Sequence, residues 1–192
     1  MGNDMKENSS FVTPIQLIDL EPIPGRESIL DIGGGGEGLV SRLEGQRVFA
    51  VDIRFDKIQE ARLYDVHSQW ILADARSICF QDASFNVASF WFSLGYFHSF
   101  KLKFAALAEA FRCMKEGGLL SIIAAKIANK EEKHVFNAHF VFPNGSISQI
   151  GFGVRGKQNQ NVAIISQLVR SAGFKVIGSE RHKYWFRIEA LK

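Results

Sequence analysis

The sequence has little of several features that define classes of protein on their own. Only two cysteines occur in 192 residues. Cys79 and Cys113 lie in apolar or helical stretches, which predicts reduced thiols in the core rather than a disulfide or a catalytic thiol. No apolar run of about 18 residues is present, and Met1–Ser10 has no apolar core, so neither a membrane span nor a signal peptide is expected. These absences favour a reduced, cytoplasmic chain.

A strong excess of one charge is also missing. The formal net charge is +3 and the isoelectric point is about 8.9, with Lys and Arg spread along the chain. This charge pattern neither demands nor excludes nucleic acid as a partner. Apolar residues are plentiful, since 46% of the chain is hydrophobic and 12% is aromatic. Length and composition predict a single domain over residues 1–192, with residues 1–10 expected to be disordered.

Glycine is concentrated in one informative place. The run Ser28-Ile-Leu-Asp-Ile-Gly-Gly-Gly-Gly-Glu-Gly38 is an apolar segment that ends in an acid and then breaks into a glycine-rich loop. Glycines allow positive φ and a close approach of the backbone to a ligand. A helix that starts near Glu37 would direct free N–H groups at that ligand. The run predicts a nucleotide-binding corner.

Strand and helix patterns alternate along most of the chain, which favours a mostly parallel sheet covered by helices. Strands are expected over residues 28–32, 47–51, 69–73, 85–92 and 119–125, and helices over 39–43, 55–63 and 104–114, the last ended by Gly117-Gly118. Pro143-Asn144-Gly145 then predicts a hairpin of strands 134–142 and 146–152. A helix over 162–172 and an antiparallel pair, 174–179 with 184–190, close the chain.

The expected fold class is α/β. It is a Rossmann-like three-layer sandwich with a mostly parallel seven-stranded sheet, an antiparallel last strand, and a β-hairpin insertion at 134–152 after the fifth strand.

Three motifs in order carry a resemblance to a known family. Ile29-Leu-Asp-Ile-Gly-Gly-Gly-Gly36, Val48-Phe-Ala-Val-Asp52 and Ile71-Leu-Ala-Asp-Ala75 resemble the glycine loop, the second-strand acid and the adenine corner of class I S-adenosylmethionine-dependent methyltransferases, in particular the small-molecule group. Further matches are Ser84-Phe-Asn86, Phe111-Arg-Cys-Met-Lys-Glu-Gly-Gly118 and Ala172-Gly-Phe174. The chain departs from the pattern at Glu37, where the third loop glycine falls, at Asn86 in place of Asp, and in a longer connection after the fourth strand.

The resemblance implies S-adenosylmethionine as the cofactor. Asp31 would hold its ammonium group, Asp52 the ribose diol, and Asp74 with the Ala75 N–H the adenine. Three Asp residues after successive strands favour one shared site, because ligands gather at the carboxyl ends of α/β strands. The other expected cofactor contacts are Gly33, Gly34, Gly35, Ile53, Phe90 and Trp91.

Catalysis needs few residues, because the methyl donor is already activated and the protein mainly aligns the acceptor and excludes water. If the acceptor must lose a proton, His98 or Tyr96 is the best-placed candidate, although each also fits a structural role beside the neighbouring phenylalanines. His134 and His139 would point to opposite faces of a strand, which argues against a metal site.

The acceptor is expected to be a small molecule with an O, N, S or C nucleophile, because no nucleic-acid methyltransferase motif is present. The hairpin residues Phe136, Phe140, Phe142 and Phe152 would form a substrate wall or face a second subunit, so a homodimer stays open. A basic rim for an anionic substrate is a further candidate, formed by Arg155, Lys157, Arg181, His182 and Lys183.

Two alternative functions remain. Gly33-x-Gly35-x-x-Gly38 with Asp52 also fits the fingerprint of an NAD(P)-binding oxidoreductase. Asp31, Asp74 and the lack of chain for a substrate domain count against it. The other alternative is a cofactor-binding subunit without activity of its own, which would bind the cofactor saturably without turnover.

Overall fold

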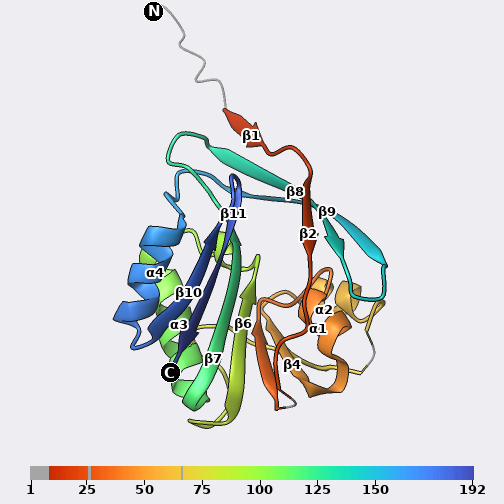
Figure 1. The fold of residues 1–192 in the computed structure, drawn as a ribbon, viewed down its shortest axis with the longest axis vertical. Helices are drawn as coiled ribbons and strands as arrows, with labels where there is room; N and C mark the ends of the chain where they lie inside the picture. The colour runs from red at the N-terminus through yellow and green to blue at the C-terminus, as the bar shows by residue number, and fades with distance from the viewer. Residues whose placement is uncertain (1–8, 26, 66) are drawn as a thin grey trace, which may run out of the picture.

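The computed structural model describes residues 9–25, 27–65 and 67–192, which form two β-sheets and four α-helices in those ranges (Figure 1). The larger sheet has seven strands in the order β10-β11-β7-β6-β3-β4-β5. Its strands are β3 (Ile29–Ile32), β4 (Val48–Asp52), β5 (Gln69–Leu72), β6 (Phe85–Trp91), β7 (Met114–Ala125), β10 (Lys175–Arg181) and β11 (Trp185–Leu191). Only β11 runs antiparallel to both of its neighbours, so the expected fold class is confirmed.

Helices lie on both faces of this sheet. Figure 1 shows α3 (Phe100–Cys113) and α4 (Val162–Ser171) on one side, and α1 (Leu39–Glu44) and α2 (Phe55–Ala61) on the other. Alternate strand residues divide between the two sides, as the period of a strand requires. Leu30 and Ile32 pack in the core that includes α3 and α4 residues, whereas Ile29 packs with Val40 of α1.

The junction between α3 and β7 differs from the prediction. α3 begins at Phe100, four residues before the expected start, because the Ser99 hydroxyl accepts a hydrogen bond from the Leu102 N–H at 3.3 Å and caps the helix. β7 begins at Met114, so Gly117 and Gly118 lie inside a strand and do not end the helix. Both glycines pair with Lys192 at the chain terminus, and this pairing extends the strand.

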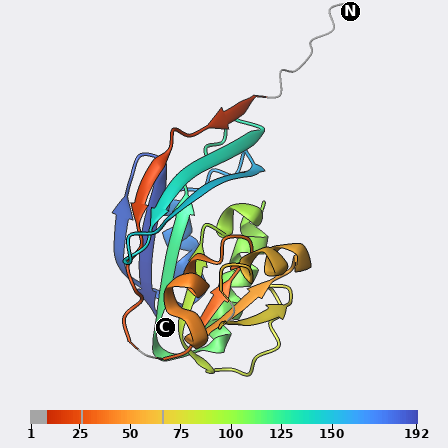
Figure 2. The same cartoon turned by 90° about the vertical axis from the view of Figure 1, so that its right-hand side faces the viewer.

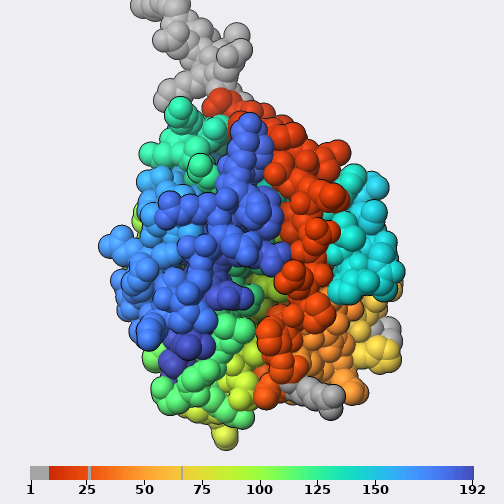
Figure 3. Space-filling view, in the orientation of Figure 1, coloured from red at the N-terminus to blue at the C-terminus, as the bar shows by residue number. Residues whose placement is uncertain are grey.

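The predicted hairpin is present as β8 (Lys133–Val141) and β9 (Ile147–Arg155), which pair antiparallel in register from Lys133–Arg155 to Val141–Ile147. The hairpin belongs to a second sheet that the sequence did not predict. β1 (Ser10–Val12) and β2 (Gln16–Asp19) both pair in parallel with β8. Figure 2 shows these strands beside the hairpin, and Figure 3 shows the same N-terminal segment running over the surface between the C-terminal strands and β9.

The small sheet packs against the larger one through its own core. Phe136 and Phe140 of β8 contact a cluster that includes Ile123 and Ala125 of β7. This packing places the hairpin beside the carboxyl ends of β3 and β6. The prediction of a disordered segment over 1–10 falls mostly outside the described residues, and Ser10 begins β1.

Two other predictions concern thiols and membranes. Cys113 is buried as expected, but Cys79 is exposed, because it lies on the irregular segment between β5 and β6 rather than in a core element. Within the described ranges, each helix lacks the length or apolar character that a bilayer span requires.

Candidate active site

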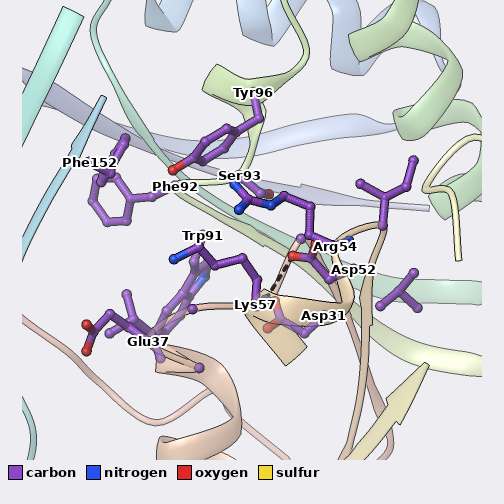
Figure 4. A pocket seen from close by; sticks show the side chains of 18 of the residues that line it. Asp31, Glu37, Asp52, Arg54, Lys57, Trp91, Phe92, Ser93, Tyr96 and Phe152 are labelled. Carbon is purple, nitrogen blue, oxygen red and sulfur yellow. Dashed lines mark hydrogen bonds between the residues drawn. The ribbon is translucent and has the colours of Figure 1, made fainter. Parts of the chain in front are cut away.

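A cavity of about 630 Å³ lies at the carboxyl ends of β3, β4, β5 and β6 and is walled on its other side by β8 and β9. Of the residues predicted to form the site, those that line it are Asp31, Gly33, Gly34, Gly35, Asp52, Ile53, Asp74, Ala75, Trp91, Tyr96 and His98. Parallel strands bring their carboxyl ends to one edge, which explains why motifs far apart in sequence meet there. Figure 4 shows Asp31 and Asp52 toward one side of the cavity and Tyr96, Phe92 and Phe152 toward the other.

Asp31 is buried in the floor of the cavity, with 2% of its surface exposed. It lies opposite Ser89 in the pairing of β3 with β6, and the Ser89 hydroxyl donates to its Oδ1 at 2.6 Å. Burial raises the pKa of Asp31 to about 7, the Ser89 hydrogen bond opposes the rise, and the charge of Asp52 adds to it. A cationic group bound here would stabilise the carboxylate.

The glycine loop packs closely against this carboxylate. A Cβ on Gly34 would lie 2.2 Å from Asp31 Oδ2, so any side chain at that position would occupy the space beside the carboxylate. Gly33 has a φ of 75°, and a Cβ there would meet the Ser93 Cβ at 2.4 Å. The loop therefore needs glycine both for its conformation and for its close approach to the acid.

Asp52 ends β4 and connects to the same loop. Its Oδ2 accepts from the Gly35 N–H at 3.0 Å, and its Oδ1 accepts from the Arg54 N–H at 2.9 Å. A carboxylate has about four acceptor sites, so two remain for the hydroxyls of a diol. Asp52 thus holds the loop and can also bind a ligand.

Asp74 follows β5 and is already paired. The Arg76 guanidinium donates to both of its oxygens and holds its pKa below the ordinary value. An adenine amino group would have to share this carboxylate with Arg76. Ala75 is buried, whereas Ile53 is exposed at the cavity wall, where an apolar side chain can cover a purine.

Of the two aromatic residues predicted near the cofactor, only one lies in the cavity. Trp91 lines the cavity, and its Nε1 donates to the Ser121 hydroxyl at 3.0 Å, which fixes the indole. Phe90 is fully buried in the core that includes α3 and α4 residues and is not among the lining residues. Successive strand residues face opposite sides of the sheet, so only one of the pair can point at the ligand.

The other end of the cavity is aromatic. Phe92, Tyr96, Phe140 and Phe152 line it from four different segments, and Ile150 adds an apolar side chain. The ring centroids are 5.1 Å apart for Phe92 and Phe140, 5.9 Å for Phe92 and Phe152, and 6.0 Å for Tyr96 and Phe152. These separations are typical of packed aromatic rings. Phe136 and Phe142 are buried and do not line the cavity.

Two further features mark this aromatic end as a binding surface. Phe92 has a φ of 60°, a left-handed conformation that is costly for a bulky side chain and that occurs mostly where function requires it. The Ser93 hydroxyl beside it is buried and has no hydrogen-bond partner among the described residues. A ligand hydroxyl, amine or carbonyl would satisfy this group.

The two predicted catalytic residues differ in character. Desolvation raises the pKa of Tyr96 above its ordinary value, so its phenol is a neutral donor near neutral pH. His98 is exposed at the rim of the cavity and makes no hydrogen bond to any described residue. A side chain that orients the imidazole, which a general base usually has, is thus not provided by the described part of the chain.

Glu37 is a lining residue that was not predicted. It accepts from the Ser148 hydroxyl at 2.5 Å, and Arg42 donates to the same hydroxyl at 2.9 Å. This cluster connects the glycine loop to β9. A glutamate in place of the family's third loop glycine was the available signal, but its partner lies 111 residues away and is found only through the fold.

The remaining candidates lie away from the cavity. Arg155, Lys157, Arg181, His182 and Lys183 are not among the lining residues. Lys157 pairs with Glu132, and His182 stacks on Trp185 at 3.7 Å. His134 is buried and His139 lies on the other face of β8, and the described residues contain no cluster of metal ligands.

Known proteins with the same fold include several methyltransferases. Residues 30–122 match the family described as methyltransferase domain. An S-adenosylmethionine-dependent methyltransferase from Methanosarcina mazei has 20% identity and a TM-score of 0.66, covering 91% of this chain and 99% of that chain. One from Mesorhizobium loti has 14% identity and a TM-score of 0.63, covering 88% and 94%. The cyclase SpnF, at 14% identity and a TM-score of 0.60, covers 93% and 76%. No curated protein matches the sequence.

Residues 30–122 thus match a methyltransferase-domain family, and the fold is shared with solved S-adenosylmethionine-dependent methyltransferases. Together they indicate S-adenosylmethionine as the cofactor and methyl transfer as the activity. The residues fit that cofactor, since the Asp31 carboxylate at the cavity floor suits an ammonium group and the open acceptor sites of Asp52 suit a ribose.

Proposed function

We propose that the protein transfers the methyl group of S-adenosylmethionine to an O, N, S or C nucleophile of a small molecule whose ring or apolar body binds among Phe92, Tyr96 and Phe152. The observation that carries the proposal is one continuous cavity with acidic residues at one end and aromatic rings at the other. The acidic end suits the amino acid and ribose of the cofactor. The aromatic end suits a flat acceptor with at least one polar group, because the Ser93 hydroxyl there has no partner in the described part of the chain.

The protein's chemical contribution is positioning. The sulfonium supplies an activated methyl group, and the aromatic wall excludes water and aligns the acceptor. Tyr96, as a neutral phenol, can donate a hydrogen bond to the acceptor. His98 at the rim remains the candidate for removing a proton from the acceptor.

A second candidate function is cofactor binding without methyl transfer. The likeness to SpnF favours keeping it, because that neighbour is described as a cyclase and still covers 93% of this chain. The same fold supports different chemistry, so the assignment rests on the site.

A labelled-methyl screen tests the proposal. Protein is incubated with S-adenosylmethionine labelled in the methyl group and with a panel of small phenols, aromatic amines, thiols and matched aliphatic compounds. We expect label in an aromatic acceptor, with Phe152→Ala raising the KM for that acceptor while the affinity for S-adenosylhomocysteine is unchanged. Cofactor binding without label in any acceptor would favour the second candidate.

The matched control is Phe80→Ala. Phe80 packs in the larger core at 5.8 Å from Phe49 and does not line the cavity. It loses a ring of the same size, so a fall in stability alone would affect both variants alike.

A further inference from the structure

Lys103 is a buried lysine that the predicted site does not include. It lies on α3 with 1% of its surface exposed. Its Nζ donates to the Leu94 carbonyl at 2.8 Å, to the Phe97 carbonyl, and to Gln158 Oε1 at 2.6 Å. All three ammonium hydrogens thus have acceptors.

Gln158 holds the same turn from the opposite side. Its Nε2 donates to the Gly95 carbonyl at 2.7 Å and to the Arg155 carbonyl at 2.6 Å. The neighbours of Gln158 in the chain, Lys157 and Asn159, both have positive φ, at 53° and 48°. Such conformations persist where surrounding contacts enforce them, which here directs the Gln158 amide inward.

The segment held in this way is η2 (Leu94–Tyr96) together with Phe97, between β6 and α3. Three of its carbonyls, those of Leu94, Gly95 and Phe97, accept from these two side chains. Tyr96 and Phe97 line the cavity. The orientation of the Tyr96 ring therefore depends on a backbone that two side chains from outside the turn fix.

A lysine is a costly choice for packing alone. No carboxylate of the described residues pairs with Lys103, and burial lowers its pKa to about 7. An apolar side chain of similar length would fill the space without the desolvation cost. What the ammonium adds is its three directed hydrogen bonds.

We propose that Lys103, with Gln158, is a positioning residue that fixes the turn at residues 94–97 and so holds Tyr96 in the acceptor end of the cavity. The proposal rests on the proposed function for the identity of that end as the acceptor site. The contacts of Lys103 themselves do not depend on it.

The three tyrosines of the chain make a direct test possible. Protein labelled with 3-fluorotyrosine gives ¹⁹F resonances for Tyr64, Tyr96 and Tyr184. A Tyr96→Phe variant, which lacks one of them, assigns the resonance of Tyr96. The test variant is Lys103→Met, and the matched control is Lys101→Met, which changes an exposed lysine of the same helix. Affinity for S-adenosylhomocysteine is measured by calorimetry on each protein.

We expect Lys103→Met to shift or broaden the Tyr96 resonance, while Tyr64 and Tyr184 keep theirs and the S-adenosylhomocysteine affinity stays within about twofold of wild type. Lys101→Met should move none of the three. An unchanged Tyr96 resonance would overturn the proposal, and so would a shift of all three, which would indicate a general structural role.

A second variant covers the case in which Lys103→Met does not fold. Gln158→Leu removes the donor to the Gly95 carbonyl and leaves the lysine in place, and the same selective change at Tyr96 is expected. If wild type does not bind S-adenosylhomocysteine, the proposed function fails while the resonance test of Lys103 still stands.

Discussion

The Asp31→Asn substitution should raise the stability of the ligand-free protein and lower its affinity for the cofactor. Asparagine has the same shape and keeps an acceptor for the Ser89 hydroxyl. It removes a charge that burial opposes, since the pKa of Asp31 rises from 3.8 to about 7. The substitution therefore separates a cost in folding from a benefit in binding.

The size of the effect follows from the pKa of Asp31. The rise of this pKa from 3.8 to about 7 corresponds to about 4 kcal/mol at a pH above both values. The new amide also needs a partner, so we expect a gain of about 2–4 kcal/mol at neutral pH. Because the pKa of Asp31 is raised in the folded state, the free energy of unfolding of wild type falls as the pH rises from about 4 to about 7. The difference in stability between the variant and wild type should therefore grow over that pH range.

The assay is urea unfolding of both proteins at several pH values, paired with calorimetry of S-adenosylhomocysteine. Near pH 4 the two free energies of unfolding should nearly coincide, and above pH 7 the variant should be more stable. Its affinity should fall about 10- to 150-fold through loss of a charge-assisted contact. A variant that is less stable than wild type above pH 7 would refute the reasoning on Asp31.

The remaining predictions concern the cofactor, the hairpin and the rim of the cavity. Wild-type affinity for S-adenosylhomocysteine, measured by calorimetry, should weaken up to about tenfold per pH unit below pH 7 as Asp31 takes up a proton, and a flat profile would contradict this. Asp52→Ala should lower the affinity about 10- to 150-fold without unfolding the domain, and unchanged affinity in the folded variant would rule out the ribose role. Replacing Pro143-Asn144-Gly145 by a shorter linker should weaken acceptor turnover but spare cofactor affinity, and loss of both would make the hairpin core structure. His98→Gln should slow turnover about 10²- to 10⁴-fold and alter its pH profile if His98 is the base, whereas an unchanged rate and acidic limb would favour catalysis by proximity.

The sequence predicts the larger sheet and the acidic end of the cavity well, because both follow from local patterns. Asp31, Asp52 and Asp74 each follow a short apolar segment, and parallel strands bring such ends together. The Pro143-Asn144-Gly145 turn likewise specifies its own hairpin.

The features that were missed depend on contacts far apart in the chain. β1 and β2 have too few residues for a periodic pattern and are strands only because β8 offers an edge. From the sequence alone, Lys103 looks like an exposed lysine on a helix, because its contacts with η2 and Gln158 form only in the folded chain. Phe90 and Trp91 look equivalent in sequence, and the direction in which each side chain points decides which one reaches the cavity.

The orientation of the cofactor is the central claim, and a crystal structure of the protein with S-adenosylhomocysteine tests it most directly. The account predicts the amino group at Asp31, the ribose hydroxyls at Asp52, and the sulfur directed toward Tyr96 and Phe152. A cofactor bound elsewhere, or with its sulfur turned away from the aromatic end, would contradict the assignment of that end to the methyl acceptor.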